Sequence, residues 1–246
     1  MNIPYHNMEI EQIYTQLLSN PRASIAICAA EQGEGVTSLA FALAQRNLLA
    51  GHSTLLVDLN LYRPSIKSLL TFQADPTTFA GQTNKHSKRS LLGLPQLVCS
   101  EQNSAVLNGV IAPNKRQHIM KLRQPGVLEQ CIEEWLEEYD TVIIDTSPLN
   151  RINAQNIPPE RIAAACDGAI LCVLAGRTPE AAIDNAMVKL NSTQAQLLGC
   201  VFNDRDNPTL KQELLREVDR IKPMLNFISR PLRNMINKSR LLALEV

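Results

Sequence analysis

The sequence has no excess of either charge, since 24 Lys and Arg residues stand against 24 Asp and Glu residues. Proteins that bind nucleic acid usually carry a basic excess, so we expect no nucleic-acid partner. No apolar run approaches the roughly 20 residues that a membrane-spanning helix needs. The opening residues MNIPYHNMEIEQ include acids and lack an apolar core, so we expect no signal peptide. We therefore expect a cytoplasmic protein whose contact with the inner membrane, if it has one, is made through a partner.

The sequence also lacks the cysteine patterns of metal and redox sites. None of its six cysteines forms a C-x-x-C pair, and no histidine stands at metal-ligand spacing from one. Several cysteines, such as Cys28, Cys172 and Cys200, lie within apolar runs. We expect reduced thiols buried in the core and no metal cluster.

Five short apolar runs are expected to form strands. They are apolar nearly throughout rather than alternating, as is typical of strands covered on both faces. They span residues 24–29, 54–57, 141–144, 169–174 and 197–202. Helical stretches are expected at 37–49, 126–138 and 179–190, the last with Thr178 as its N-cap. This alternation predicts an α/β fold, a doubly wound and mostly parallel sheet with helices on both faces.

We predict a main domain over residues 1–206 and a C-terminal helical extension over residues 207–246 that packs on the same domain. The extension is expected to form two or three helices, which Pro223 and Pro231 would interrupt. Basic and apolar residues alternate in it at helical spacing. A helix packed on the domain and a membrane-surface helix both fit that pattern.

A glycine-rich turn joins the first predicted strand to the first predicted helix. It reads EQGEGVTS over residues 31–38. Glycines let backbone N–H groups surround an anion, and the helix N-terminus adds partial positive charge. In a working phosphate loop a lysine at the position of Val36 would reach the phosphates, and the Thr37 hydroxyl would hold Mg²⁺. The candidate nucleotide-binding residues of this turn are Gly33, Glu34, Gly35, Val36, Thr37 and Ser38.

Two aspartates end predicted strands. Asp58 follows TLLV, and Asp145 follows TVII. Carboxylates at the C-terminal ends of buried parallel strands face the ligand crevice of an open α/β sheet. Together with Thr37, these two side chains are the candidate Mg²⁺ ligands, should a nucleotide bind.

These segments resemble the bacterial tyrosine kinases, P-loop proteins of the MinD and ParA superfamily. GEGVTS is similar to the family's GEGKST loop, VDLNLYRPSI to its DADLRRPS motif, and DTVIIDTSPLN to its YVIIDTPP strand. CDGAILCVLAGRT resembles ADGVLLVVRAGKT, and LLGCVFND resembles LGVVLNRV, which puts Asn203 where the family contacts adenine. The resemblance covers residues 11–206. It implies a P-loop NTPase-like domain with ATP or ADP and Mg²⁺ as ligands. It also implies a role in capsule or exopolysaccharide assembly and export, with an inner-membrane polysaccharide co-polymerase as partner.

The departures from the family pattern bear on activity. Valine replaces the loop lysine at Val36, and Asn60 replaces an acid of the second motif. No tyrosine follows Tyr139, whereas the family carries a C-terminal tyrosine cluster. The family's ring-forming E-x-x-R-x-x-R helix is represented by Glu11, Tyr14 and Leu17.

These losses favour a catalytically inactive partner or regulator in polysaccharide assembly. No catalytic residue is then assigned, Asp58 and Asp145 are vestigial, and the chain binds no nucleotide or binds ATP or ADP with Mg²⁺ weakly. If the chain binds no nucleotide, the glycines would serve only the tight turn and helix packing. One alternative is an active ATPase or tyrosine kinase with a non-standard loop. Another is a MinD-like membrane-localisation factor, although Glu31 stands where that group carries an extra lysine.

Overall fold

The computed structural model describes residues 7–18, 23–64, 71–72, 92, 96–100, 103–151, 156–205, 210–221 and 226–238. The chain divides into two compact units, one of residues 1–174 and 178–203, the other of residues 175–177 and 204–246. The division falls close to the predicted boundary at residue 206. The packing of the extension on the main domain stays a prediction.

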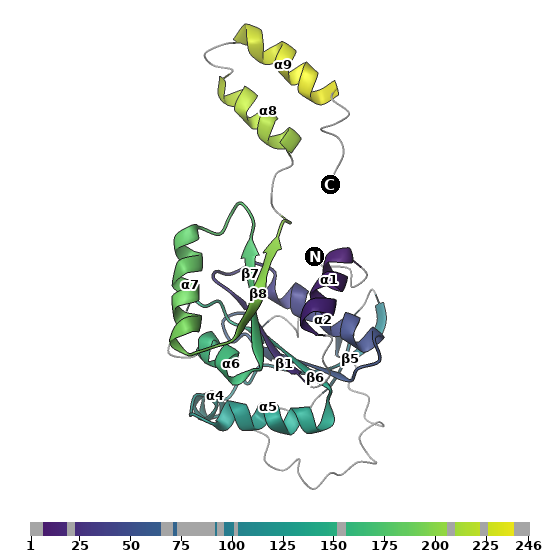
Figure 1. Ribbon diagram of the computed structural model, residues 1–246, viewed down its shortest axis with the longest axis vertical. Helices are drawn as coiled ribbons and strands as arrows, with labels where there is room; N and C mark the ends of the chain where they lie inside the picture. Colours follow the sequence, from purple (N-terminus) through teal and green to yellow (C-terminus); the bar gives the residue numbers. More distant parts are fainter. Residues whose placement is uncertain are drawn as a thin grey trace. The chain divides into compact units, whose positions relative to one another are not determined.

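The first unit is built on one sheet with the strand order β3-β4-β5-β2-β6-β1-β7-β8 (Figure 1). Six neighbouring strands run parallel: β5 (Asn103–Val110), β2 (Thr54–Leu59), β6 (Thr141–Thr146), β1 (Ala23–Ala29), β7 (Gly168–Leu174) and β8 (Leu197–Asn203). At one edge β4 (Gln96–Ser100) and β3 (Thr71–Phe72) continue the sheet antiparallel. The predicted doubly wound, mostly parallel sheet is confirmed.

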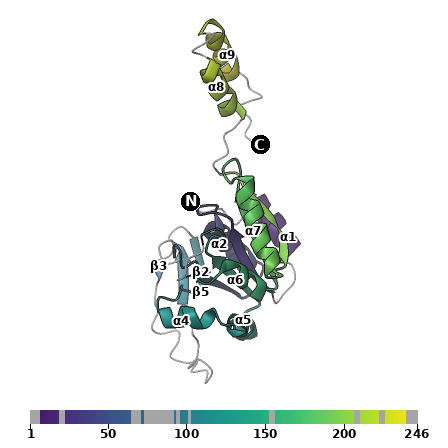
Figure 2. The ribbon, with the colours of Figure 1, turned by 90° about the vertical axis from the view of Figure 1, so that its left-hand side faces the viewer.

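Helices cover both faces of the sheet, which two separate apolar clusters show (Figure 2). One face carries α2 (Val36–Leu49), with α1 (Met8–Leu17) packed against it. The other carries α5 (Val127–Glu138), α6 (Pro159–Ala165) and α7 (Glu180–Ser192), with α4 (Arg116–Leu122) beside α5. In β1, Ile25 and Ile27 face α2 while Ala26 and Cys28 face the other layer. Since both faces of the central strands are covered, their sequences are apolar throughout.

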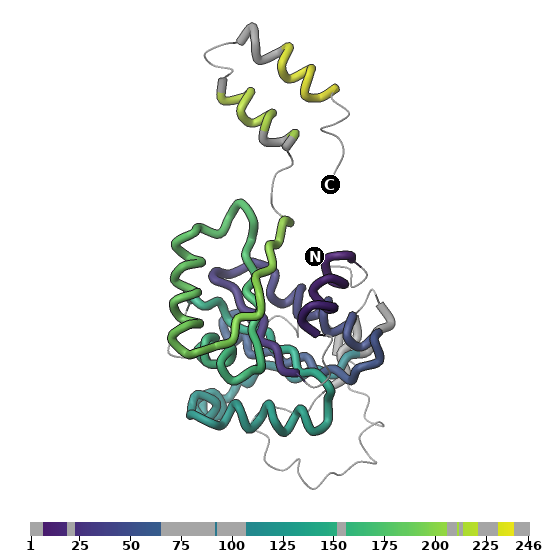
Figure 3. The backbone as a smooth tube through the Cα atoms, viewed as in Figure 1, coloured from purple at the N-terminus to yellow at the C-terminus, as the bar shows by residue number. Residues whose placement is uncertain are grey.

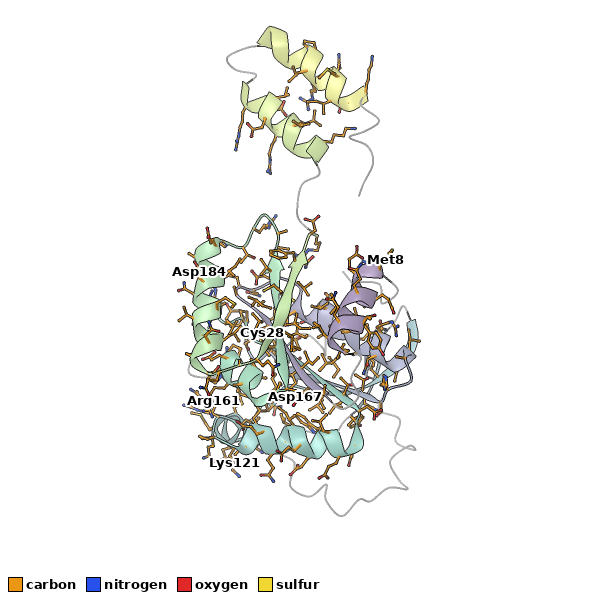
Figure 4. All side chains as sticks on the ribbon, in the orientation of Figure 1. Met8, Cys28, Lys121, Arg161, Asp167 and Asp184 are labelled. Atoms are coloured by element: carbon orange, nitrogen blue, oxygen red, sulfur yellow. The ribbon has the colours of Figure 1, made fainter. Side chains whose placement is uncertain are left out.

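The cysteine prediction holds for four of the five thiols whose surroundings are described. Cys28, Cys131, Cys166 and Cys172 are free and buried. Burial raises the pKa of Cys28, in the middle of the sheet (Figure 4), to about 12, so this thiol is protonated and unreactive.

Cys200 is an exception to that prediction, because its side chain is exposed. It lies on β8, the last strand of the sheet, where Phe202 is 70% exposed. The expectation that every apolar run is covered on both faces is therefore wrong for β8. One face of this edge strand is open in its own unit.

The second unit contains two helices in contact, α8 (Leu210–Ile221) and α9 (Asn226–Lys238), whose path Figure 3 traces. Pro231 lies inside α9 and does not interrupt it, contrary to expectation. Its missing N–H removes one hydrogen bond, and the exposed position gives the ring room on the solvent side. Pro223 lies outside the described residues. Among the described helices, none is both long and apolar enough to cross a membrane.

Candidate functional site

The glycine-rich turn forms a loop between β1, at the centre of the parallel strands, and α2. Both of its glycines have left-handed backbone angles, φ 87° at Gly33 and φ 101° at Gly35, which residues with a Cβ rarely adopt. A Cβ at Gly33 would meet no described atom within 4 Å, whereas one at Gly35 would lie 2.4 Å from the Asn203 amide nitrogen. The loop therefore has open space at Gly33 and is closed against β8 at Gly35.

Glu34 points into the protein and helps to hold the loop. Its side chain is 2% exposed, and its Oε2 accepts a hydrogen bond from the Glu31 backbone N–H at 3.1 Å. Its Oε1 accepts from the Thr178 hydroxyl, and its backbone carbonyl accepts from the Asn203 amide at 3.0 Å. Glu34 thus ties the loop to β8 and to Thr178, in the segment between β7 and α7.

Thr178 has a different role from the predicted one. Its hydroxyl accepts the Leu174 N–H at 3.0 Å and donates to Glu34, while Pro179 caps α7. The sequence pattern of Thr before Pro suggested a helix cap. The Thr178 hydroxyl instead donates to the buried Glu34 carboxylate, which competes with the start of the helix as its hydrogen-bond partner.

Val36 is the first residue of α2 and stands where a phosphate loop carries its lysine. Its side chain is partly buried and packs against the apolar cluster between α2 and the sheet. The next residue, Thr37, is the second of the helix, and its hydroxyl is directed to Asp145 at the end of β6. Ser38 is partly buried behind it.

The two predicted aspartates lie directly beside each other. Asp58 and Asp145 are register partners on the parallel strands β2 and β6, and neither is exposed. The Thr37 hydroxyl donates to Asp145 Oδ2 at 2.5 Å. The structure therefore brings Thr37, Asp58 and Asp145 together at the C-terminal edge of the sheet, as the sequence predicts.

Two buried carboxyl groups that lie side by side cannot both ionise freely. Burial, together with the neighbouring Asp58 carboxylate, raises the pKa of Asp145 to about 8, although hydrogen bonds from the side chains of Thr37 and Asn60 act in the other direction. Asn60, which replaces an acid of the family motif, thus contributes a donor where a carboxylate would add a third negative charge. The Asp58 carboxylate in turn accepts the Asn60 backbone N–H at 2.9 Å.

Asp145 Oδ1 is buried and has no hydrogen-bond partner among the described residues. A buried acceptor without a donor fits a cation that would be bound together with phosphate oxygens and water, as Mg²⁺ usually is. Within the described part of the chain, no group of three or more His, Cys, Asp and Glu side chains is placed to hold a metal alone. The residues present therefore fit Mg²⁺ as part of a nucleotide complex.

Sequence reasoning missed a basic residue at the mouth of the loop. The segment after β6 continues beside the segment after β1, because Leu149 N–H donates to Ala29 O at 2.8 Å and Asn150 N–H to Ala30 O at 3.1 Å. The next residue, Arg151, forms an ion pair with Glu31 in which Nε lies 3.1 Å from Oε2. No sequence spacing announces this pair, since its members are far apart in the chain and both lie in loops.

Solved structures with a similar fold define the class of protein. The chimerical protein CapA2B2 aligns with TM-score 0.58 and 20% identity over 79% of this chain and 81% of that one. The kinase domain of Escherichia coli tyrosine kinase ETK aligns with TM-score 0.55 and 15% identity, over 82% and 75%. Cobyrinic acid a,c-diamide synthase from Mycobacterium smegmatis, with bound ADP and magnesium, aligns with TM-score 0.53 and 15% identity over 81% of this chain and 82% of that one. The fold is that of the P-loop NTPases.

Sequence similarity narrows this class to one family, although no family model matches the chain. The tyrosine-protein kinase CpsD of Streptococcus agalactiae is 32% identical over 186 residues, which are 73% of this chain and 74% of the relative. The tyrosine-protein kinase YwqD of Bacillus subtilis is 26% identical over 183 residues, 74% and 72% of the two chains. The chain belongs to the bacterial tyrosine-kinase family.

Proposed function

We propose that this chain is a catalytically inactive member of the bacterial tyrosine-kinase family, acting as a cytoplasmic partner or regulator in capsule or exopolysaccharide assembly. The observation that carries the proposal is Val36 at the start of α2, an apolar side chain packed against the core where the family has its loop lysine. Preorganised positive charge at that position acts chiefly on the transition state of phosphoryl transfer. Its loss removes turnover more completely than it removes binding.

Weak nucleotide binding is compatible with this function. The N–H groups around Gly33 and Gly35 would donate hydrogen bonds to phosphate oxygens, and Thr37, Asp58 and Asp145 would hold Mg²⁺. Bound Mg²⁺ supplies charge that offsets the phosphates. The amide of Asn203, which resemblance assigns to adenine, is engaged with the Glu34 carbonyl and closes the loop from the β8 side.

An active ATPase with a non-standard loop is the second candidate. The hydrogen bond from Thr37 to Asp145 favours it, because it keeps two metal ligands together, and Asp145 Oδ1, which no described residue contacts by a hydrogen bond, is left for a cation. Turnover measurements separate the two candidates.

We expect the chain alone to form no ring. In α1, the Glu11 carboxylate pairs with the Arg46 guanidinium of α2, which also lies 4.1 Å from the centre of the Tyr14 ring. Leu17 packs against the cluster on the α2 face. These three residues, where the family has Glu, Arg and Arg, are thus engaged within one chain. Tyrosine and leucine also cannot replace the paired bonds of a guanidinium.

The mass of the purified protein, measured by light scattering after size-exclusion chromatography over a range of concentrations, tests this expectation. A mass near that of one chain at every concentration agrees with it. A stable octamer would show that other surfaces assemble the ring.

We expect the partner to be an inner-membrane polysaccharide co-polymerase or another polysaccharide-assembly protein. Affinity purification of the tagged chain from cross-linked cells of its native host, followed by mass spectrometry, measures this. An unrelated tagged cytoplasmic protein serves as the control bait. Recovery of no polysaccharide-assembly protein above that control would count against the proposed partner while leaving the prediction on turnover untouched.

A further inference from the structure

We propose that Arg151 is the cation that binds the phosphate chain of a nucleoside di- or triphosphate at this loop, in place of the missing lysine, and that Glu31 is its competing counter-ion. The proposal rests on the weak nucleotide binding allowed under the proposed function. It assigns that binding to a residue outside the glycine loop.

The backbone fixes where Arg151 lies. Hydrogen bonds from Leu149 to Ala29 and from Asn150 to Ala30 align the segment after β6 with the beginning of the loop, one residue for one residue. Arg151 is the next residue of that segment, and Glu31 is the next residue of the loop. Main-chain pairing therefore brings the backbone of Arg151 beside the loop, and the ion pair with Glu31 then orients its guanidinium.

The acidic side chains around the loop oppose the binding of an anion, so a cation at the loop would favour it. Glu31 lies at its entrance and Glu34 is buried within it, with the two aspartates behind. Backbone N–H groups alone would have to offset the repulsion between these carboxylates and a phosphate chain. A guanidinium can do so, because its planar donors match phosphate oxygens and its charge is permanent.

The ion pair is of a kind that a phosphate can displace. The side chains of Arg151 and Glu31 are 57% and 32% exposed, so solvent weakens their attraction and little is lost when it breaks. The Arg151 guanidinium also lies within electrostatic reach of Tyr62, in the loop after β2. Its guanidinium therefore interacts with residues of both the loop after β1 and the loop after β2.

A second observation points independently to a ligand at this place. Asp145 Oδ1 is fully buried behind the loop without a hydrogen-bond partner among the described residues. That acceptor fits the cation which accompanies a phosphate chain. Arg151 would thus contact the phosphate chain, while Asp145 would contact the cation bound with it.

Isothermal titration of the full chain with ATP–Mg²⁺, ADP and inorganic pyrophosphate tests the proposal. We expect Arg151→Ala to weaken all three on the order of tenfold, because a charge-assisted bond is lost. Arg151→Lys should keep part of the affinity. Glu31→Gln should strengthen binding several-fold, since it removes the competitor for the same guanidinium. Arg116→Ala, an exposed arginine on α4, is the matched control and should change nothing.

Arg151→Ala and Glu31→Gln are expected to change the ligand affinity in opposite directions, and this difference decides the test. If the ion pair only supported the loop, Arg151→Ala and Glu31→Gln would weaken binding together, and that result would overturn the proposal. Unchanged affinity in Arg151→Ala, or no saturable binding of any of the three ligands to the unmodified chain, would overturn it as well. Turnover by the unmodified chain would instead contradict the proposed function and leave this assignment standing.

Discussion

The unmodified chain is expected to hydrolyse no ATP and to phosphorylate no tyrosine above background, while Val36→Lys should bind ATP–Mg²⁺ about ten to a hundred times more tightly. The lysine ammonium would offset charge on the phosphates directly at the start of α2, where valine now packs on the core. Val36→Lys should still not phosphorylate itself, because the chain has no tyrosine after Tyr139.

Titration calorimetry and a phosphate-release assay measure the two parts of this prediction. Val36→Met is the matched control, because methionine approaches lysine in length and carries no charge. It should leave affinity close to that of the unmodified chain. Robust ATP hydrolysis by the unmodified chain, abolished in Asp58→Ala or Asp145→Ala, would show that the chain is an enzyme with a non-standard loop.

The free energy of unfolding in EDTA should fall as the pH rises from about 4 to about 8. An aspartate ionises near pH 3.9 in the unfolded chain, whereas the pKa of Asp145 in the folded protein is about 8. Between these values the folded state holds a proton that the unfolded state has released, so raising the pH favours unfolding. Asp145→Asn removes this term, and we expect it to stabilise the protein at pH 8 by about 2–4 kcal/mol.

Urea unfolding at pH 5, 6.5 and 8 measures the effect. Asp184→Asn, on the exposed surface of α7 (Figure 4), is the matched control and should follow the unmodified chain. Asn60→Asp should act in the opposite direction at pH 8, because it replaces a donor to Asp145 by a third carboxylate. Adding Mg²⁺ should recover much of that loss. Parallel pH curves for Asp145→Asn and the unmodified chain would mean that Asp145 is ionised in the fold.

The parallel core of the sheet could be predicted from the sequence because β1, β2, β6 and β7 are covered on both faces, and the edge strand β8 is apolar as well. Their apolar runs coincide with β1, β2, β6, β7 and β8 to within two residues. The remaining strands gave no such signal. β5 reads NSAVLNGV and β4 reads QLVCS, with polar residues that interrupt any apolar run. β4 is part of the antiparallel edge and β5 lies next to it. Which strands pair there depends on the rest of the fold and not on a local apolar run.

The site was predictable where it depends on strand ends. Asp58, Asp145 and Thr37 lie together because parallel strands and the helix after β1 meet at one edge of a sheet. The contacts of Arg151 and Thr178 were not predictable, because both lie in loops and meet their partners only through the folded main chain. Glu34 was predicted only as a nucleotide-binding residue of the turn, and its burial with contacts to Thr178 and Asn203 depends in the same way on the folded chain.

The close approach of Gly35 to Asn203 affects how conserved glycines should be interpreted in this family. A side chain at Gly35 would collide with an amide that fastens β8 to the loop, whether or not a nucleotide ever binds. Selection for folding alone would therefore keep this glycine in a chain that had lost all affinity for phosphate. Gly33 has open space around it, so only its left-handed backbone angle, φ 87°, disfavours a side chain there. Among inactive relatives, replacement of the first glycine while the second is kept would mark a loop that has become purely structural.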